Sequence, residues 1–597
     1  MGARGGRVEG ISGRTQRRLD IMARPSGAAI LMIPTSRIPG MTLLALLLAA
    51  CGGKNEESMQ TANLVLVHGQ IHTLDPAVPD SSALAVIGDR VARVGTDKEI
   101  TAMVGPGTRK IDLEGRTVIP GLIDAHLHLM GIGRSLEELD LREIATPEEA
   151  VRRVSEAASR AAPGAWIQGR GWDQNLWPAK EFPTASMLDA VTGDHPVAFY
   201  RVDGHALWVN TKALESAGIK RGMPDPRGGR VLRDRSNGEP SGVLLDDAME
   251  LVRTKIPTPE PATKRRWVQL AGARLLASGI TSVQDAGVEP EDIDLYKMMV
   301  EEGSLPIRVY AMLGGSNRKL PDYFVQARVI GYGDRRFTYR ALKLGVDGAL
   351  GSRGASLLEP YSDDPKNSGL STMSGEQVEE ITRQALTRGF QVCVHAIGDR
   401  ANRMVLDRFQ SALAAVPTPD ARLRIEHAQI LSPPDIVRFE RLGIVASMQP
   451  IHATSDMPWV PARLGPDRLA GAYAWKSLLD SSAHLAFGSD APVETSNPFK
   501  GMFAAVTRQD EKLMPEGGWL PEQRLTREEA LHAYTLGAAY AAFEENEKGT
   551  LTPGKLADLV VLDRDFFEVP DAEIFEISPQ MTVLGGKVVY TGPQPQQ

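Results

Sequence analysis

The sequence contains very little cysteine. Only Cys51 and Cys393 occur among its 597 residues, so a framework of disulfide bonds cannot organise the fold. Hydrophobic residues make up 42% and charged residues 24% of the chain, which is the composition of an ordinary globular protein. The 58 glycines and 40 prolines are spread along the chain. They therefore indicate turns in a folded protein rather than a low-complexity segment.

The chain also lacks an excess of positive charge. Its 67 Lys and Arg residues are outnumbered by 75 Asp and Glu residues, which gives a formal charge of -8. A protein that binds nucleic acid usually shows a basic patch or stripe, so this charge argues against such a partner. A membrane-remodelling function is also disfavoured, because we find no basic amphipathic stretch.

A hydrophobic run near the N-terminus is too short to cross a bilayer as a helix. The segment MTLLALLLAA ends at Ala50, whereas a spanning helix needs about 20 apolar residues. Its length, with Arg37 upstream, is typical of the apolar region of a signal peptide. The run LAAC resembles a bacterial lipobox, in which Cys51 becomes the lipidated first residue of the mature protein. The alternative is a buried apolar segment with a chance cysteine.

The lipobox predicts the organisation of this end of the chain. We expect residues 1–50 to be a signal peptide with an upstream extension, and residues 51–61 to be a lipidated tether. The protein is then expected to be a lipoprotein on the periplasmic side of a bacterial envelope, which meets the membrane only through its lipid anchor.

Two β-rich segments bracket the rest of the chain. Residues 63–73 and 83–95 form one, and residues 558–562 and 580–591 form the other, with a Gly-Gly hairpin turn in the last segment. We therefore predict a small β-sandwich domain that is built from both chain ends, residues 62–115 and 546–597.

The middle of the chain, residues 116–545, alternates short apolar strands with amphipathic helices, a pattern that favours a parallel sheet. Residues 150–260 break this alternation and predict an insertion over one end of the sheet. The length suits a barrel plus an accessory domain. We predict an α/β fold, a distorted (β/α)₈ TIM barrel. The expected strands are 117–124, 280–285, 307–313, 341–346, 390–395, 423–427, 444–448 and 485–489. Two further candidate strands near Trp166, Arg201 and Trp208 leave the second to fourth barrel strands unassigned.

Several polar residues stand where these strands end. His126 and His128 share one side of a strand, because alternate residues point the same way. His-x-His alone fits hydrogen-bonded strand histidines equally well, but His395 ends FQVCVH, His427 ends LRIEH and Asp490 follows LAFGS. In a (β/α)₈ barrel all such strand ends open on one face. Imidazole and carboxylate are common ligands of Zn²⁺ and similar ions, so the pattern predicts a divalent metal site.

The order His-x-His, Lys, His, His, Asp resembles that of the amidohydrolase superfamily. Further segments resemble its amidohydrolase-3 branch, which includes N-substituted formamide deformylases. They are GRGWDQNLWP, RVDGHALWVN, KLGVDGALGSRGA, VHAIGDRAN, IEHAQ and GSDAPVE. The resemblance covers residues 62–592, and these motifs are specific for the branch but not for a substrate.

The resemblance implies a role for each ligand. His126 and His128 would bind the more buried metal, His395 and His427 would bind a second metal, and Asp490 would bind the first metal and act as the acid and base. The cofactor would be one or two divalent ions, with Zn²⁺ as the expected metal.

Lys343 occupies the position where the family often carries a carboxylated lysine that bridges two metals. A free ammonium has no acceptor for a metal, whereas a carbamate offers anionic oxygens. The alternative is a charged Lys343 held by Asp347, with a single metal bound by four protein ligands.

Other positions are candidates for the walls of the site. His205, in VDGH, is expected to orient the substrate or its oxyanion, and the alternative is an insertion-domain histidine capped by Asp203. The candidate substrate-binding residues are Trp172, Asp173, Arg353 and Trp459. Buried aromatic packing is the alternative for the tryptophans, and a surface or loop-bracing role is the alternative for Arg353. Cys393 is expected to be a small packed residue, and His452 is a candidate supporting residue.

These residues predict a metal-dependent hydrolase that cleaves an amide or formamide-like C–N bond with activated water. Hydrolysis of a cyclic amide, ester or lactone by the same centre is the first alternative. A surface-tethered binding lipoprotein without catalysis is the second, and the complete ligand set argues against it. The expected partners are a small-molecule substrate and a second copy of the chain in a homodimer.

Overall fold

The computed structural model describes residues 60–314 and 327–593. The expected signal peptide, the lipidated Cys51 and most of the tether lie outside the described residues. Within those two ranges, every helix is too short or too polar to cross a membrane.

Eight parallel strands form the central sheet, in the order β8-β15-β16-β18-β19-β20-β21-β22. Their bounds are β8 Leu122–Leu127, β15 Ile280–Val288, β16 Arg308–Leu313, β18 Phe337–Gly345, β19 Gln391–Ala396, β20 Arg424–His427, β21 Val445–Met448 and β22 His484–Phe487. Strand order follows chain order without a break, as a (β/α)₈ barrel requires. The predicted barrel is therefore confirmed.

The two edges of this sheet meet at their carboxyl ends. The backbone N–H of Asp490, just after β22, donates to the carbonyl of His126 over 2.7 Å, and the N–H of His128 donates to the carbonyl of Ala491 over 2.8 Å. These bonds connect the first and last strands where the predicted metal ligands lie.

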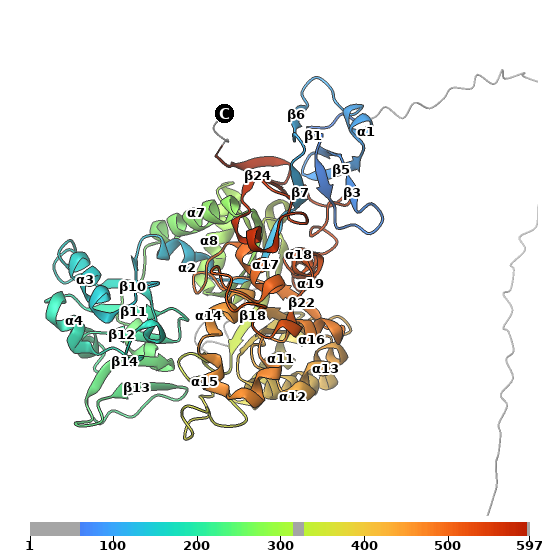
Figure 1. Cartoon of the computed structure of the whole chain (residues 1–597). Coiled ribbons are helices and arrows are strands. Elements are labelled where there is room, and N and C mark those ends of the chain that lie inside the picture. The colour runs from blue at the N-terminus through green and yellow to red at the C-terminus, as the bar shows by residue number, and fades with distance from the viewer. Residues whose placement is uncertain (1–59, 315–326, 594–597) are drawn as a thin grey trace, which may run out of the picture. The chain divides into compact units, whose positions relative to one another are not determined.

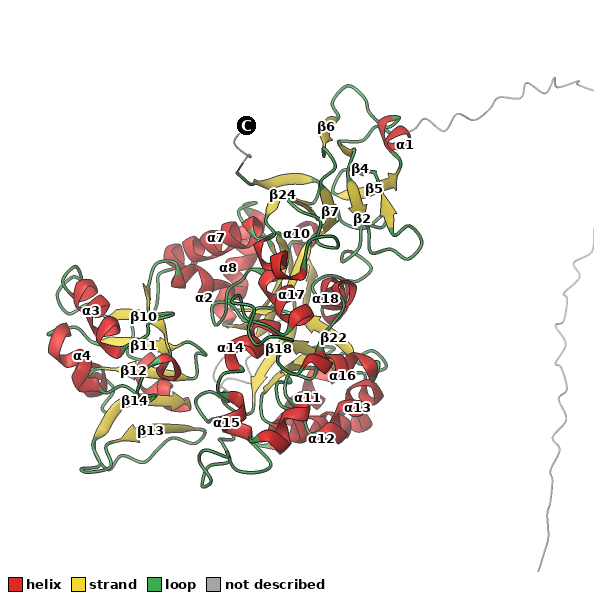
Figure 2. Cartoon of the chain, viewed as in Figure 1, coloured by secondary structure: helices red, strands yellow, loops and turns green. Residues whose placement is uncertain are grey.

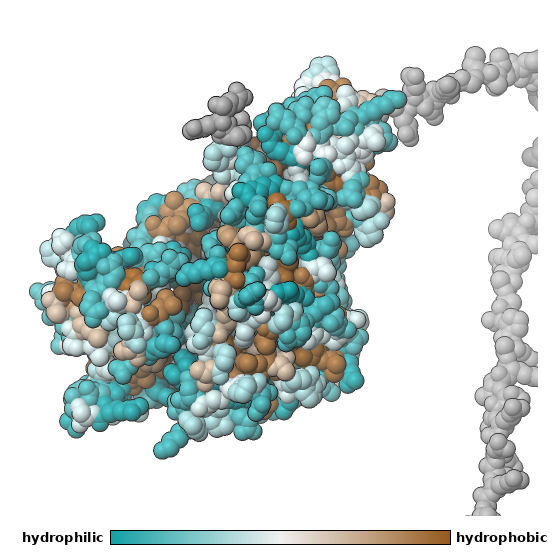
Figure 3. Space-filling view, in the orientation of Figure 1, coloured by the Kyte–Doolittle hydropathy of each residue, from teal (hydrophilic) through white to brown (hydrophobic). Residues whose placement is uncertain are grey.

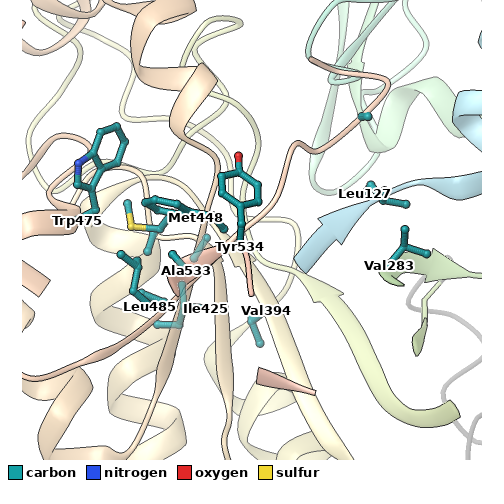
Figure 4. Packing of buried hydrophobic residues seen from close by; sticks show 14 of the residues in the cluster. Leu127, Val283, Val394, Ile425, Met448, Trp475, Leu485, Ala533 and Tyr534 are labelled. Atoms are coloured by element: carbon teal, nitrogen blue, oxygen red, sulfur yellow. The ribbon is translucent and has the colours of Figure 1, made fainter. Parts of the chain in front are cut away.

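Helices cover the outside of the barrel (Figure 2). For example, α11 begins with a capping box between Ser374 and Gln377 and buries the apolar stripe Val378, Ile381 and Ala385. Figure 4 shows the core beneath the helices, where Ile425 and Leu485 lie close to Met448 and Trp475. The helices between and after the strands are α2 Leu129–Ser135, α7 Pro261–Ala277, α8 Pro290–Glu301, α11 Gly375–Thr387, α12 Asp399–Ala415, α13 Pro433–Leu442, α14 Pro450–Asp456, α15 Val460–Leu464, α16 Trp475–Asp480, α17 Pro498–Thr507, α18 Arg527–Ala533 and α19 Leu536–Ala541.

One expected strand proves to be two. Residues 117–124 divide into β7 (Thr117–Pro120), which pairs with a C-terminal strand of another sheet, and β8, which enters the barrel. The division falls at Pro120-Gly121, where proline cannot donate to a ladder. The second to fourth barrel strands are β15, β16 and β18, because the candidates near Trp166, Arg201 and Trp208 form a different sheet.

That different sheet is the insertion, which has the strand order β13-β14-β12-β11-β10-β9. It begins at Leu139, earlier than the predicted boundary near residue 150. In Figure 1 its strands carry α3 and α4 on one side. The bounds are β9 Leu139–Asp140, β10 Ile167–Trp172, β11 Val197–Arg201, β12 Ala206–Val209, β13 Gly229–Arg233 and β14 Pro240–Asp246, with helices α3 Pro147–Ala158, α4 Ala185–Thr192, α5 Thr211–Ser216 and α6 Glu250–Arg253.

The two chain ends share one small β structure. A four-stranded sheet has the order β5-β4-β1-β6, and a six-stranded sheet has the order β25-β24-β23-β7-β2-β3. Leu66 and Leu84 pack in one core with Leu559 and Val583, so strands from both ends bury each other. The bounds are β1 Leu64–Val67, β2 Gln70–His72, β3 Asp80–Ser81, β4 Ala83–Ile87, β5 Arg90–Gly95, β6 Arg109–Asp112, β23 Leu559–Leu562, β24 Pro579–Leu584 and β25 Lys587–Thr591. Polar and apolar residues intermingle on the face seen in Figure 3, as on most globular surfaces.

Candidate metal centre and active site

The predicted metal ligands converge at the carboxyl ends of the barrel strands. The Nε2 atoms of His126 and His128 lie 3.5 and 3.1 Å from Oδ1 of Asp490, and Nζ of Lys343 lies 3.5 Å from Nε2 of His126. The ring of His427 is 4.9 Å from that of His126 and 4.6 Å from that of His395, between centroids. Six side chains spread over the sequence therefore form one cluster.

The backbone is unusual at two of these positions. His427 has φ of 74° and Asp490 has φ of 56°, a left-handed region that non-glycine residues seldom adopt. Such strain concentrates at functional sites, where the surrounding structure holds it. Gly488 permits the close approach of the last strand, because a Cβ there would lie 2.5 Å from the backbone nitrogen of His126.

His126 and His128, at the end of the first barrel strand, each use Nδ1 for a hydrogen bond. This leaves the Nε2 atom of each neutral ring without a proton. Nδ1 of His128 lies 2.8 Å from the carbonyl oxygen of Ala286, and Nδ1 of His126 lies 2.5 Å from Oε2 of Glu426. Both partners only accept, so a neutral imidazole carries its proton on Nδ1 and a lone pair on Nε2. Those lone pairs face a carboxylate oxygen of Asp490. A cation between these three atoms would satisfy them all, so the residues fit a divalent metal.

Glu426 is a functional residue that the sequence reasoning missed. It is fully buried and accepts hydrogen bonds from the guanidinium of Arg424, over 2.8 and 3.1 Å. Burial alone would raise the pKa of Glu426, but Arg424 and His126 hold it well below its usual range. The ionised carboxylate orients His126, as an outer-shell acid does for many metal-binding histidines. The sequence did contain a signal for this role, because two charged residues, Arg424 and Glu426, alternate with apolar residues on a strand that is otherwise typical of the barrel interior.

The protonation states also suit a metal. Burial lowers the pKa of His126 to about 4, and burial lowers the pKa values of His395 and His427 well below the usual range. Burial would raise the pKa of Asp490, but the neighbouring imidazoles of His128, His126 and His427 hold it well below its usual value. At neutral pH the cluster therefore offers neutral imidazoles and an ionised carboxylate, which are metal-binding forms.

Lys343 is not paired with Asp347. That carboxylate accepts the backbone N–H groups of Ser356, Ile397 and Gly398, and its Oδ1 lies 3.5 Å from Nε2 of His395. Burial lowers the pKa of Lys343, which favours the neutral amine that reacts with CO₂. The charged Lys343–Asp347 pair, the alternative from the sequence, is therefore wrong.

A cavity of about 950 Å³ opens over the cluster. Strand ends of the barrel, loops of the inserted sheet and residues after α17 all line it, and its lining includes His205, His395, His427 and Asp490. The cavity therefore gives a small molecule access to the predicted ligands.

His205 lies on the cavity wall, and its ring centroid is 5.0 Å from that of His395. Its Nδ1 is 2.8 Å from Oδ1 of Asp246. Burial alone would lower the pKa of His205, but the hydrogen bond and charge of Asp246 raise it to about 9. Asp203 accepts the backbone N–H of His205 and does not contact the ring nitrogen. The ring can therefore present an N–H to an oxygen in the cavity.

The candidate wall residues divide into two groups. Asp173 and Trp459 line the cavity. Trp172 does not, because it is fully buried in the inserted sheet and its indole N–H donates to the carbonyl of Phe199. Arg353 also lies outside the lining and makes two hydrogen bonds of 3.1 Å to Asp363. The predicted contacts of Trp172 and Arg353 with the substrate are therefore wrong. Trp172 is packed in the core of the inserted sheet, and Arg353 is paired with Asp363.

Three further residues reach the cavity, of which only His452 was a candidate from the sequence. His452 lies with its Nε2 3.8 Å from Oδ2 of Asp490. Asp456 and Glu494 line the same wall, and burial raises the pKa of Asp456 to about 7. His452 and Asp456 lie on α14 and Glu494 lies in the loop after β22, so the strand pattern does not place them. Cys393 is buried in the barrel interior, as expected.

The barrel and the cluster at its carboxyl end define the class of metal-dependent hydrolases. The amidohydrolase-3 profile of the amidohydrolase family matches residues 109–590. A metal-dependent hydrolase from Pyrococcus horikoshii aligns with a TM-score of 0.70 and 31% identity, over 85% of this chain and 99% of its own. The chain therefore belongs to the amidohydrolase family, and the predicted resemblance is confirmed.

Three curated proteins align along most of the chain. Protein LONG AFTER FAR-RED 3 of Arabidopsis thaliana is 36% identical, over 89% of this chain and 92% of its own. The putative amidohydrolase YtcJ of Bacillus subtilis is 32% identical, over 87% and 98%. N-substituted formamide deformylase of Arthrobacter pascens is 28% identical, over 89% and 99%.

Proposed function

We propose that the protein hydrolyses the C–N bond of a small amide or N-substituted formamide, using Zn²⁺ or a similar divalent ion. The observation that carries this proposal is the meeting of unprotonated imidazole nitrogens of His126 and His128 with the carboxylate of Asp490, beneath an open cavity. The likeness to the Arthrobacter deformylase along nearly its whole length supports the bond type.

His126, His128, Lys343, His395, His427 and Asp490 would hold the metal centre, with Lys343 as the site of a carbamate bridge. A divalent ion there would supply Lewis-acid activation and lower the pKa of bound water from about 16 to near 7. The chain's own groups then move the protons and hold the substrate.

Asp490 is the proposed proton carrier. It is ionised and lines the cavity, so it can take a proton as water attacks the carbonyl and return that proton to the leaving nitrogen. His205 would donate a hydrogen bond to the developing oxyanion, an interaction that strengthens in the transition state. Asp173 and Trp459 would contact the rest of the substrate.

A hydrolase panel on the metal-reconstituted full-length protein tests the proposal. The panel spans N-formyl amines, N-acyl amino acids, cyclic amides, esters and lactones, and activity is measured before and after chelation. We expect metal-dependent turnover that is highest on linear amides or formamides. Preference for an ester, a lactone or a cyclic amide would favour the alternative reaction, and no turnover on any substrate would favour a binding protein.

We also propose that Cys51 anchors the protein by a lipid on the periplasmic side of a bacterial envelope. The lipobox-like run before Cys51 supports this. Intact-mass analysis of the mature protein tests it, and a product that retains residues before Cys51 would contradict it. The homodimer stays a prediction that sedimentation velocity can check.

A further inference from the structure

Asp246 is the last residue of β14 in the inserted sheet, and its backbone is unusual. It has φ of 48° and ψ of -125°, a left-handed region that residues with a side chain seldom adopt. Such a conformation is strained and persists only where the surrounding structure holds it. Residues in this state concentrate at active sites, so the strain points to a role for Asp246 beyond the end of a strand.

The carboxylate of Asp246 is buried against His205. Its side chain is 3% exposed, and Oδ1 lies 2.8 Å from Nδ1 of the His205 ring. The backbone N–H of Asp246 also donates to the carbonyl of His205 over 3.1 Å. One residue therefore holds His205 by both its main chain and its ring. The other ring nitrogen, Nε2, is left for the cavity, which His205 lines.

A loop of the barrel forms a seat for this carboxylate. The loop follows β18, the strand of Lys343, and includes Gly348 and Gly354. A Cβ at Gly348 would lie 2.6 Å from Oδ1 of Asp246, and a Cβ at Gly354 would lie 2.8 Å from Oδ2. Both distances are shorter than real Cβ atoms make with a neighbour. Glycine at these two positions therefore admits the carboxylate, because it has no side chain to displace it.

Backbone hydrogen bonds close the loop around the seat. The N–H of Gly348 donates to the carbonyl of Gly354 over 3.2 Å, and the N–H of Gly354 donates to the carbonyl of Ala349 over 2.9 Å. Oδ2 of Asp246 is buried without a hydrogen-bond partner among the described residues. A buried polar atom of this kind calls for an explanation, because it lowers stability. A carboxylate that is placed to hold His205, rather than to stabilise the fold, provides one.

The seat belongs to the barrel, whereas His205 belongs to the inserted sheet. The His205 ring reaches the predicted metal centre, with its centroid 5.0 Å from that of His395. Asp246 thus connects the two parts of the chain that form the active site.

We propose that Asp246 is a positioning residue for the hydrolysis. Its carboxylate, seated between Gly348 and Gly354, holds the His205 ring so that Nε2 faces the substrate oxygen. A supporting contact of this kind keeps a catalytic group in its productive geometry. The proposal rests on the proposed function of His205 as the donor to the oxyanion.

Steady-state kinetics of the metal-reconstituted full-length protein, on the best substrate of the panel, test the proposal. The variants are Asp246→Ala, Asp246→Asn, Gly348→Ala, His205→Gln and the double variant His205→Gln, Asp246→Ala. Asp189→Ala is the matched control in the inserted sheet. Asp189 accepts two hydrogen bonds from Thr211, over 2.9 and 2.7 Å, and lies outside the cavity lining. Urea unfolding confirms that each variant is folded under the assay conditions.

The expected losses fall on kcat and leave KM nearly unchanged. His205→Gln should lower kcat by about 10²-fold, the usual cost of removing one donor to an oxyanion. Asp246→Ala and Gly348→Ala should each lower kcat by about tenfold or more, within that limit. Asp246→Asn keeps an acceptor oxygen and should retain more activity than Asp246→Ala. The double variant should be no slower than His205→Gln, because Asp246 acts through the ring. Asp189→Ala should keep the kcat of the wild type.

A second measurement is independent of turnover. Diethyl pyrocarbonate modifies accessible, unprotonated imidazoles, and mass analysis of peptides follows the modification of His205. We expect the modification of His205 to be severalfold faster in Asp246→Ala and Gly348→Ala than in the wild type, because the ring loses its hydrogen bond. Asp189→Ala should react at the rate of the wild type.

Two results would overturn the proposal. If Asp246→Ala lowers kcat as much in the His205→Gln background as it does alone, Asp246 does not act through His205. If the modification rate of His205 is unchanged in both Asp246→Ala and Gly348→Ala, the seat does not hold the ring. If no panel substrate is turned over, the proposed function fails, and the modification rates still support or overturn the hold of Asp246 on His205.

Discussion

Nδ1 of His126 and Oε2 of Glu426 lie 2.5 Å apart, although 300 residues separate them in the sequence. Glu426 is in turn held by the guanidinium of Arg424, and all three side chains are buried. This chain of contacts fixes the ring orientation of a predicted ligand from the opposite part of the barrel. It explains why the charged pair of Arg424 and Glu426 is buried next to the predicted metal ligands.

Replacement of Glu426 by glutamine should weaken metal binding. Loss of the carboxylate removes the group that orients His126, and outer-shell changes typically cost 10–100-fold in metal affinity. Arg424 would keep a buried charge without its partner, so the free energy of unfolding should fall by about 3 kcal/mol. Metal titration and urea unfolding measure the two effects. The double variant Arg424→Met, Glu426→Leu should recover stability but not metal affinity. Wild-type metal affinity in Glu426→Gln would contradict the positioning role.

Replacement of Asp490 by asparagine should reduce kcat by about 10²–10⁴-fold, the usual contribution of a positioned general base. Asparagine keeps the size of the side chain but cannot accept a proton at neutral pH. Steady-state kinetics on the best substrate of the panel measure the effect, with circular dichroism as the folding control. Turnover near that of the wild type would show that another group carries the proton.

The two tryptophans that were expected to wall the site should behave differently. Trp172→Ala should lower the free energy of unfolding by about 3–5 kcal/mol, because it opens a hole in a well-packed core. Its KM should be close to wild type. Trp459→Ala should change KM with a smaller loss of stability, because Trp459 lines the cavity. Urea unfolding and kinetics on both variants test the contrast, and a larger KM effect in Trp172→Ala would reverse these assignments.

The pair of His205 and Asp246 should make stability depend on pH. The pKa of His205 is raised to about 9 in the folded protein, against about 6.5 in an unfolded chain. The folded state therefore holds the proton more tightly, and this contribution is complete below pH 6.5 and is lost as the pH rises through 9. For the chelator-treated protein, the difference in unfolding free energy between wild type and His205→Gln should shrink from pH 6 to pH 9.5. A difference that is constant over this range would contradict the raised pKa.

The sequence predicted the barrel well, because its strands are short apolar runs that alternate with amphipathic helices and several of them end in a polar residue. His395 and His427 end apolar runs, and the structure places both at the mouth of the barrel. The assignment of residues 117–124 to one strand failed, because apolar character alone cannot show which sheet a strand joins. The pairing of Asp347 with backbone N–H groups rather than Lys343, and of Arg353 with Asp363, depends on loop paths that no local pattern specifies.

The sequence named His452 as a supporting candidate, whereas it gave no role to Glu426. His452 follows a strand by four residues and reaches the cluster only through the turn of α14. Glu426 neighbours a ligand in sequence, and its function becomes visible only when the first strand is placed beside it. Both roles arise from packing between distant segments.

The most direct test of the account is an anomalous-diffraction map of crystals of the zinc-reconstituted protein, recorded on both sides of the zinc absorption edge. The account predicts a zinc peak within about 2.2 Å of Nε2 of both His126 and His128, at the carboxyl end of the barrel. Fully reconstituted, active protein that shows no anomalous peak near these two nitrogens would contradict it.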